Sequence, residues 1–453
     1  MRTGIVLAAG RGQRMRSRLT KVAHTILGQP LLSYPVRALI GAGASEIVVV
    51  LPAAHPELER LLSGFPVRFA YQNQPRGTGD ALRAAVSSLP ANPGTLLITY
   101  GDSPLLQWQT LAQLAELSES SGGLALLSTE LADPKGYGRV MRDQQGQVTE
   151  IVEEKDLPPG DNPHEINAGV YATGAEILDL LPELEPNNNS SEFYLTDIVA
   201  LYRKRGWTVQ ALSSPDASQA WGVNNRLGLA RAESILLDQL RNYWMEQGVR
   251  MVAPETIYLE ATVKLAPDVT LWPGVILRGQ TEIAAGASVG AYSVLDSVIL
   301  GENVELKSHV VAERVELKSG ADAGPFARLR PGTILESGVH VGNFVEVKNS
   351  HLGNGVQAGH LAYIGDAEIG PQVNIGAGAI TANYDGRRKN QTKVGAGAFI
   401  GSNAVLVAPL EVGAGAWVAA GSTITQDVPD QALAIARERQ RNIEGYRKKD
   451  SSD

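Results

Sequence analysis

Residues 394–424 read VGAGAFIGSNAVLVAPLEVGAGAWVAAGSTI and decide the fold of the carboxyl-terminal half of the chain. An aliphatic residue stands at every sixth position of this stretch: Val394, Ile400, Leu406, Val412, Val418 and Ile424. A period of six is neither helical nor the two-residue alternation of an ordinary strand. It indicates short strands that each bury one aliphatic residue and then turn a corner, so that three strands close a triangular coil. The stretch therefore predicts a left-handed parallel β-helix built from hexapeptide repeats.

The same period reaches back to about residue 251. Its earlier members are Ile257, Val263, Val269, Val275, Ile283, Val289, Val298, Val304 and Val310. After Ile380 the repeat breaks, and it resumes only at Val394, 14 residues on rather than 12. We expect a polar loop with Arg387, Arg388 and Lys389 to leave the coil at this break.

The amino-terminal half has a different pattern. Short β-rich runs cover residues 3–8, 46–51, 95–99 and 123–129, and helix-like stretches between them cover 31–40, 78–89 and 105–120. This alternation predicts an α/β, Rossmann-like domain whose mostly parallel sheet is covered on both faces. Ligands of such sheets bind at the carboxyl ends of the strands.

One long helix is expected between the halves, because apolar residues recur at helical spacing over residues 226–247. We interpret it as a connector, since the period of six begins just after it. The expected organisation is a first domain over 1–226, a linker helix over 227–247, and a β-helix with a charged tail over 248–453.

Composition excludes several classes of protein. The 453 residues include no cysteine, which excludes disulfides and thiolate metal sites, and the net charge of −8 argues against nucleic-acid binding. No segment approaches the ~20 apolar residues that span a bilayer. The apolar run at the amino terminus is too short for a signal peptide. We therefore expect a cytoplasmic protein without membrane insertion.

The first strand runs into a glycine-rich loop, because residues 7–15 read LAAGRGQRM and Lys21 follows. Gly10 and Gly12 allow backbone N–H groups to approach a phosphate closely, and Arg14 and Lys21 can neutralise it. The loop lacks the Gly-Lys-Ser/Thr ending of a Walker loop. Alone, it is equally consistent with a tight turn between strand and helix.

Three further motifs favour a nucleotide site. Residues 72–79 read QNQPRGTG, residues 100–104 read YGDSP and residues 221–225 read WGVNN. Asp102 follows a buried strand, where its carboxylate could hold a hard cation. With GYGR at 136–139, IVE at 151–153, EIN at 165–167 and YLTD at 194–197, these motifs resemble the uridyltransferase half of a bacterial family. That family is the bifunctional N-acetylglucosamine-1-phosphate uridyltransferase/glucosamine-1-phosphate acetyltransferase, and the resemblance covers essentially the whole chain.

The resemblance implies a site for UTP and UDP-N-acetylglucosamine, with Mg²⁺ held by Asp102 and Asn224. The implied binding residues are Leu7, Ala8, Ala9, Gly10, Arg14, Lys21, Gln72, Gly77, Thr78, Tyr100, Gly101, Asp102, Gly138, Glu153, Asn167 and Asn224. The sequence departs from the family at Gln13, where Thr is usual, and at Thr20, where Pro is usual. In the implied reaction, a sugar phosphate oxygen attacks the α-phosphorus of UTP and pyrophosphate leaves. That oxygen is already anionic, so the site needs positioning and neutralising charge rather than a general base.

Residues 325–390 carry more polar groups than a structural β-helix needs. His360 stands in GHLAY at 359–363, and histidine is the side-chain type best suited to accept an amine proton near neutral pH. With PFARLRPG at 325–332, VNIGAG at 373–378 and NYDG at 383–386, this region resembles the acetyltransferase half of the same family.

That second resemblance implies acetyl transfer from acetyl-CoA to glucosamine 1-phosphate, with His360 as the catalytic base. The implied ligands of the sugar phosphate are Arg330, Lys348, Tyr363, Asn374 and Lys389. The implied acetyl-CoA residues are Ala377, Asn383, Tyr384, Ser402, Ala420 and Arg437. The family further implies a homotrimer with sites between subunits, and a product that supplies peptidoglycan and lipopolysaccharide synthesis.

Two alternatives remain open from the sequence. One is a single-function sugar-1-phosphate nucleotidyltransferase whose β-helix is structural or regulatory, and the cluster around His360 argues against it. The other is a scaffold protein with decayed sites, which the presence of Lys21, Asp102 and His360 argues against.

Overall fold

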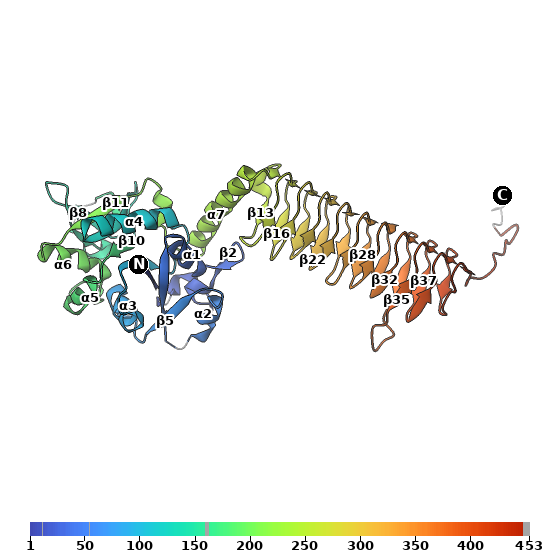
Figure 1. The fold of residues 1–453 in the computed structure, drawn as a ribbon, viewed down its shortest axis with the longest axis horizontal. Coiled ribbons are helices and arrows are strands. Elements are labelled where there is room, and N and C mark those ends of the chain that lie inside the picture. Colours follow the sequence, from blue (N-terminus) through green and yellow to red (C-terminus); the bar gives the residue numbers. More distant parts are fainter. Residues whose placement is uncertain (11, 54, 159–162, 447–453) are drawn as a thin grey trace, which may run out of the picture. The chain divides into compact units, whose positions relative to one another are not determined.

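A computed structural model describes residues 1–10, 12–53, 55–158 and 163–446 of the protein (Figure 1). The chain forms two compact units that divide between Leu236 and Leu237. No helix in the described ranges is long and apolar enough to cross a bilayer.

The first unit is built on one mixed sheet with the strand order β11-β7-β10-β6-β1-β4-β5. The strands are β1 (Arg2–Leu7), β4 (Ala44–Pro52), β5 (Val67–Gln72), β6 (Thr95–Tyr100), β7 (Leu124–Glu130), β10 (Glu165–Thr173) and β11 (Val209–Ser213). Neighbours are parallel except at β10, which is antiparallel to both β6 and β7. A hairpin of β8 (Arg139–Arg142) and β9 (Val148–Val152) pairs with β10. The predicted α/β fold is confirmed, with one strand reversed in the sheet.

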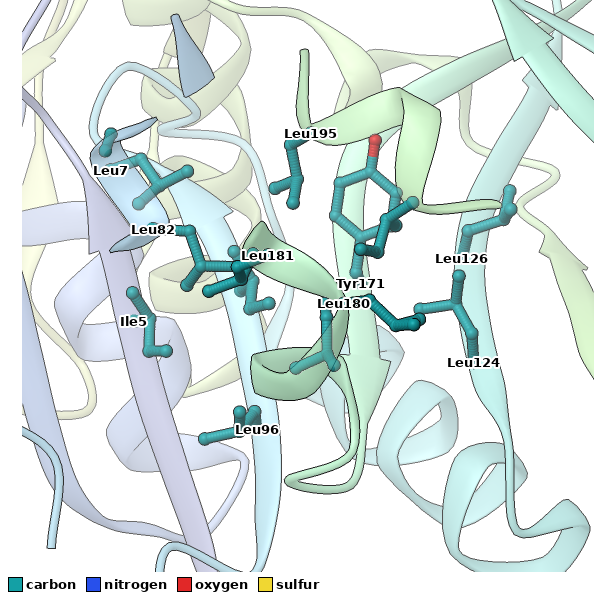
Figure 2. Packing of buried hydrophobic residues seen from close by; sticks show 14 of the residues in the cluster. Ile5, Leu7, Leu82, Leu96, Leu124, Leu126, Tyr171, Leu180, Leu181 and Leu195 are labelled. Carbon is teal, nitrogen blue, oxygen red and sulfur yellow. The ribbon is translucent and has the colours of Figure 1, made fainter. Parts of the chain in front are cut away.

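Helices cover both faces of this sheet because successive side chains of each strand point to opposite faces. Ile5 and Leu7 of β1 pack toward α3 (Thr78–Ala85), α5 (Ile177–Leu180) and α6 (Ile198–Lys204). Val6 packs toward α1 (Ser33–Gly41), α2 (Pro56–Leu61) and α4 (Trp108–Ser121). Figure 2 shows the first of these cores, where Ile5 and Leu7 lie beside Leu82 of α3. Burying one such side chain fully stabilises the unit by about 1.5–3 kcal/mol.

The parallel strands β5, β4, β1 and β6 end at the same edge of the sheet, which brings distant motifs together. Leu7, the last residue of β1, pairs with Val50 of β4 and with Tyr100 of β6. The glycine-rich loop, Gln72 and Asp102 therefore all lie at this edge. The predicted long helix is α7 (Arg226–Glu246), and the two compact units divide within it.

The second unit is a left-handed parallel β-helix, as predicted. In the described residues, its strands form three parallel sheets of 11, 10 and 9 strands, beginning with β12 (Arg250–Met251), β13 (Tyr258–Leu259) and β14 (Lys264–Leu265). Most coils take 17 or 18 residues, so that β15 (Thr270–Leu271) pairs with β18 (Ser288–Val289). The strand β15 buries one side chain, Leu271, as expected, and the period-six residue Val269 is buried immediately before the strand. This side of the coil therefore buries two apolar residues, of which the six-residue period identified one.

The predicted loop does leave the coil. Strand β34 (Ile380–Ala382) ends before it and β35 (Thr392–Val394) follows it (Figure 1). Ala367 pairs with Thr392 across this insertion, a separation well beyond one ordinary coil. A bridge between Tyr384 and Lys389 closes the loop on itself.

Candidate active sites

The front motifs line one pocket of about 1250 Å³ in the first unit. Every residue that the resemblance assigned to UTP and UDP-N-acetylglucosamine lines this pocket, with the exception of Gly101. Gly101 lies beneath it, where its N–H donates to the carbonyl of Leu7 at 2.9 Å. A Cβ at Gly101 would come within 2.7 Å of the Ala8 side chain, so this position admits only glycine.

Two side-chain oxygens converge on one cation at the β6 end of the pocket. The Lys21 ammonium, at the start of a 3₁₀ helix, donates to Asp102 Oδ2 and, at 3.2 Å, to Asn224 Oδ1. Arg14 donates to the same Asn224 oxygen at 2.9 Å. The Lys21 and Asp102 side chains are only 14% and 15% exposed, which strengthens their attraction because solvent screens it weakly. The backbone holds the group together, since the N–H of Val223 donates to the carbonyl of Asp102 at 2.8 Å.

At the β5 end, Gln72 is held by a residue that the sequence reasoning missed. Its Nε2 donates to Asp80 Oδ2 at 2.8 Å and to the carbonyl of Gly77 at 3.2 Å. Thr78 begins α3 and accepts a hydrogen bond from the N–H of Leu195 at 2.9 Å. Gly77 has a φ of 116°, and a Cβ there would collide with the backbone of Phe193.

A third part of the pocket contains Gly138, Glu153 and Asn167. The N–H of Asn167 donates to the carbonyl of Gly138 at 2.9 Å, and Thr196 donates to Glu153 Oε1 at 3.2 Å. Burial raises the pKa of Glu153, and also that of Tyr100, which therefore stays neutral. A Cβ at Gly138 would come within 3.0 Å of Ile151 and 3.4 Å of Glu153 Oε1, so this position favours glycine.

In the second unit, His360 lies at the end of β30 (Gln357–His360) and is exposed. Its Nδ1 is 2.6 Å from Oδ1 of Asn343, which lies one coil earlier in β27 (His340–Asn343). With Asn343 Oδ1 as the acceptor, this contact favours the tautomer that carries its proton on Nδ1 and leaves Nε2 as the basic nitrogen.

A second polar group surrounds Asp366. Lys348, at the end of β28 (Glu346–Lys348), donates to both of its oxygens at 3.0 and 3.1 Å, and Asn349 and Asn383 donate to it as well. Burial opposes ionisation of Asp366, but hydrogen bonds from Asn349, Lys348 and Asn383 outweigh it and lower its pKa. Asn383 also reaches the hydroxyl of Tyr363 at 3.4 Å.

The remaining predicted residues fall into three places. Arg330 pairs with Glu346 at 2.8 Å and lies one coil before Lys348. Lys389 lies in the inserted loop, where a hydrogen bond and the charge of Lys348 lower its pKa. Asn374, in β33 (Asn374–Ile375), belongs to the sheet of His360.

Three of the residues assigned to acetyl-CoA stack in successive coils. The N–H of Asn403 donates to the carbonyl of Ala377, and the N–H of Gly421 donates to that of Ser402, each at 2.8 Å. Ala420, next to Gly421, continues this line. Tyr384 is exposed in the inserted loop, and Arg437 is exposed beyond the last strand.

The sequence reasoning missed Asn343 and Asp366, although a signal for both was present. Asn343 precedes His360 by 17 residues, and Asp366 follows Lys348 by 18 and precedes Asn383 by 17. In a β-helix this spacing places side chains one above another, so a polar residue one coil from a candidate is itself a candidate.

The fold and the pocket define a nucleotidyltransferase joined to a hexapeptide-repeat domain. Residues 4–156 match the family model of the MobA-like NTP transferase domain, and residues 391–426 match that of the hexapeptide repeat of succinyl-transferase. The bifunctional protein GlmU of Thermus thermophilus is 52% identical over 447 residues, which cover 98% of both chains. The bifunctional protein GlmU of Heliobacterium modesticaldum is 42% identical over 448 residues, and that of Sorangium cellulosum is 43% identical over 454 residues. Both cover 98% of this chain, and 97% and 95% of their own. The chain therefore belongs to the family of bifunctional GlmU proteins.

Proposed function

We propose that the protein carries out two reactions of UDP-N-acetylglucosamine synthesis. It acetylates glucosamine 1-phosphate with acetyl-CoA, and then transfers the uridylyl group of UTP to N-acetylglucosamine 1-phosphate with release of pyrophosphate. The observation that carries the proposal is the presence of a separate constellation in each unit. One is the group of Lys21, Asp102 and Asn224, and the other is formed by the pair of His360 with Asn343 and the polar group around Asp366. Bifunctional relatives match the chain across both units.

For uridylyl transfer, the pocket positions two anions and supplies positive charge. Arg14 and Lys21 lie at the β6 end, where they neutralise the phosphates of UTP and stabilise the charge that develops as pyrophosphate leaves. Gly138, Glu153 and Asn167 hold the N-acetyl sugar beside them. The attacking phosphate oxygen carries its own charge, so the chain's side chains orient it and remove no proton.

Asp102 and Asn224 fit a Mg²⁺ ion. Their oxygens already converge on one cation, the Lys21 ammonium, and a carboxylate and an amide oxygen suit a hard ion whose other ligands are phosphate oxygens and water. When bound, Mg²⁺ would add positive charge at the phosphates.

For acetyl transfer, His360 Nε2 accepts the proton that the sugar amine loses as its nitrogen attacks the thioester carbonyl. The carbon–sulfur bond then breaks, coenzyme A leaves as the thiolate, and His360 returns the proton to its sulfur to give the thiol. The Asn343 oxygen holds Nδ1–H, which keeps Nε2 free for this role. Arg330, Lys348 and Lys389 bind the phosphate of the sugar, Tyr363 and Asn374 bind its remaining groups, and the line from Ala377 through Ser402 to Ala420 contacts acetyl-CoA with Asn383, Tyr384 and Arg437.

The assembly that we propose is a homotrimer through the β-helix, with acetyl transfer sites between subunits. We place the enzyme in the cytoplasm, where its substrates UTP and acetyl-CoA are made.

The test measures both reactions on one preparation. Thiol release is followed with acetyl-CoA and glucosamine 1-phosphate, and pyrophosphate release with UTP and N-acetylglucosamine 1-phosphate. Both should be enzymatic and saturable. Pyrophosphate release without thiol release would leave only a nucleotidyltransferase with a structural β-helix.

A further inference from the structure

Asp80 is a buried carboxylate whose contacts are explained neither by the core nor by the phosphate chemistry. It lies in the first turn of α3 and is 8% exposed. One oxygen accepts from Gln72 Nε2 at 2.8 Å, and the other accepts from Arg76 at 2.9 Å. Arg76 is itself held in place, because its guanidinium lies 5.6 Å from the ring centre of Phe193 and its carbonyl accepts from the N–H of Phe193.

These contacts determine which end of the Gln72 amide faces the pocket. An ionised carboxylate and a backbone carbonyl can only accept, and both Asp80 and the carbonyl of Gly77 lie against Nε2. The opposite orientation of the amide would set Oε1 against these two acceptors. Oε1 has no partner among the described residues and is not sealed inside the protein, so it faces the pocket that Gln72 lines.

The position of Gln72 suits contact with a base rather than with phosphates. Gln72 ends β5, the edge strand, which lies three strand spacings from β6, about 14 Å at the usual spacing. The cationic side chains Arg14 and Lys21 gather at the β6 end, with Asp102. A nucleotide with its phosphates at that end can extend across the strand ends and place its base at Gln72.

We propose that Asp80 is a positioning residue that sets base specificity, by holding the Gln72 amide with its oxygen toward the nucleotide. The ring edge of uracil presents a donor, N3–H, which Gln72 Oε1 can accept. In cytosine the same nitrogen is an acceptor, so two lone pairs would face each other. The proposal rests on the proposed uridylyl transfer.

The sharpest test is Asp80→Asn, which keeps the shape and changes the hydrogen-bonding pattern. Arg76 can only donate, so the single oxygen of the new amide turns to Arg76 and its NH₂ group turns to Gln72. The Gln72 amide then loses its single orientation, because the new NH₂ group favours Oε1 on that side while the carbonyl of Gly77 still favours Nε2. In the reversed orientation, Gln72 presents Nε2 to the base. The ratio of kcat/KM for UTP to that for CTP should fall about ten-fold or more, the factor that one mismatched hydrogen bond is worth. The change should appear in KM and in the equilibrium Kd of each nucleotide.

Glu176→Gln is the matched control. Glu176 is a carboxylate of the same unit that accepts from Thr173 and Tyr202 and does not line the pocket. Its variant should leave the UTP-to-CTP ratio unchanged. Thermal unfolding and thiol release check that both variants fold.

These measurements test the positioning role of Asp80 separately from the proposed uridylyl transfer. A parallel loss of UTP and CTP turnover in Asp80→Asn, with the ratio preserved, would overturn the positioning role and leave Asp80 structural. A wild-type protein that binds UTP but releases no pyrophosphate would refute the proposed function. The Kd ratio for UTP and CTP would still decide whether Asp80 sets base preference.

Discussion

Lys21, Asp102 and Asn224 come from three distant parts of the sequence, and side-chain hydrogen bonds from Lys21 join them. Lys21 donates to both of the others, and Arg14 donates to Asn224. Removing the single carboxylate takes away the strongest oxygen ligand of the group, and it leaves the partly buried Lys21 without its counter-ion. Asp102 is therefore the residue on which the charge balance of the pocket depends most.

For that reason, we expect Asp102→Ala to lower uridylyl transfer by at least about a hundred-fold, the range for removal of a charged group that stabilises a transition state. Acetyl transfer should continue, since its residues belong to the other unit. Pyrophosphate release and thiol release on the same sample measure the two effects. Intact UTP turnover in this variant would refute the metal assignment.

His360 gives the corresponding prediction for acetyl transfer. The amine of glucosamine 1-phosphate is mostly protonated at neutral pH, and a positioned base contributes about 10²–10⁴-fold. His360→Ala should lose that factor in thiol release and keep uridylyl transfer from preformed N-acetylglucosamine 1-phosphate. Asn343→Ala should have a smaller effect in kcat, because it frees the ring without removing the base. Near-wild-type thiol release in His360→Ala would remove His360 from the mechanism, and parallel loss of both activities would indicate misfolding.

At the scale of elements, the sequence predicts those strands and loops that a local spacing of residues determines. The six-residue period predicts every coil from Val394 to Ile424, because each short strand repeats the same local pattern. The loop between β34 and β35 also follows from a break in that period. Spacing does not encode partners across the sheet. The reversal of β10 therefore could not be predicted, because its direction is set by pairing with β6 and β7, far away in the sequence.

The same limit applies to the two candidate sites, because contacts between residues distant in the sequence could not be predicted. The sequence motifs contain most of the residues that line the nucleotide pocket, because glycine-rich loops and strand ends are local signals. Asp80 was missed although it lies one residue after the QNQPRGTG motif, since only its contact with Gln72 reveals a role. The partners Asn343 and Asp366 become predictable once one coil is known to take 17 or 18 residues.

One ladder of charges on the β-helix predicts a dependence of stability on pH. His351, in β29 (His351–Leu352), lies between Glu368 at 2.6 Å and Glu336 at 3.0 Å. Hydrogen bonds that the His351 ring donates to Glu368 and Glu336 raise the pKa of His351 above its ordinary value of 6.5. The protonated ring therefore stabilises the fold fully below pH 6.5, and this contribution is lost as the pH rises through the raised pKa.

We accordingly expect His351→Gln to destabilise the protein more at pH 6 than at pH 9. The difference should stay below about 1 kcal/mol, because the ring is partly exposed. Urea unfolding of the variant and the wild type at the two pH values measures it. If His351→Gln lowers the free energy of unfolding equally at both pH values, the charge of His351 contributes nothing and its contacts with Glu368 and Glu336 stabilise the fold by packing alone.

At the scale of the whole molecule, the β-helix carries an exposed aromatic ladder that one chain leaves uncovered. Tyr292, His309, Phe326 and Phe344 stack at successive coils, with ring centres 5.4, 4.7 and 5.3 Å apart. Tyr292, Phe326 and Phe344 are 62%, 48% and 55% exposed. A continuous exposed apolar line of this kind is typical of a contact surface between proteins. It suits the repeated, flat side that a second coil of the same period would present in the proposed trimer.

The double variant Phe326→Asp/Phe344→Asp should therefore break the trimer, because it would bury two unpaired charges in the contact. Phe326 and Phe344 have φ values of 56° and 57°, a region that Asp tolerates, so the coil itself should remain folded. Light scattering at micromolar concentration should show trimers for the wild type and a smaller mass for the variant. If the acetyl transfer sites lie between subunits, the double variant should lose thiol release as it loses the trimer. Its pyrophosphate release should persist. Ile299→Asp is the control, since Ile299 is 47% exposed, lies in β20 (Ile299–Leu300) and is outside the ladder, whose residues lie in turns between strands. A double variant that keeps the wild-type mass would exclude this ladder as the contact, and a monomeric wild type would refute the trimer and the shared site together.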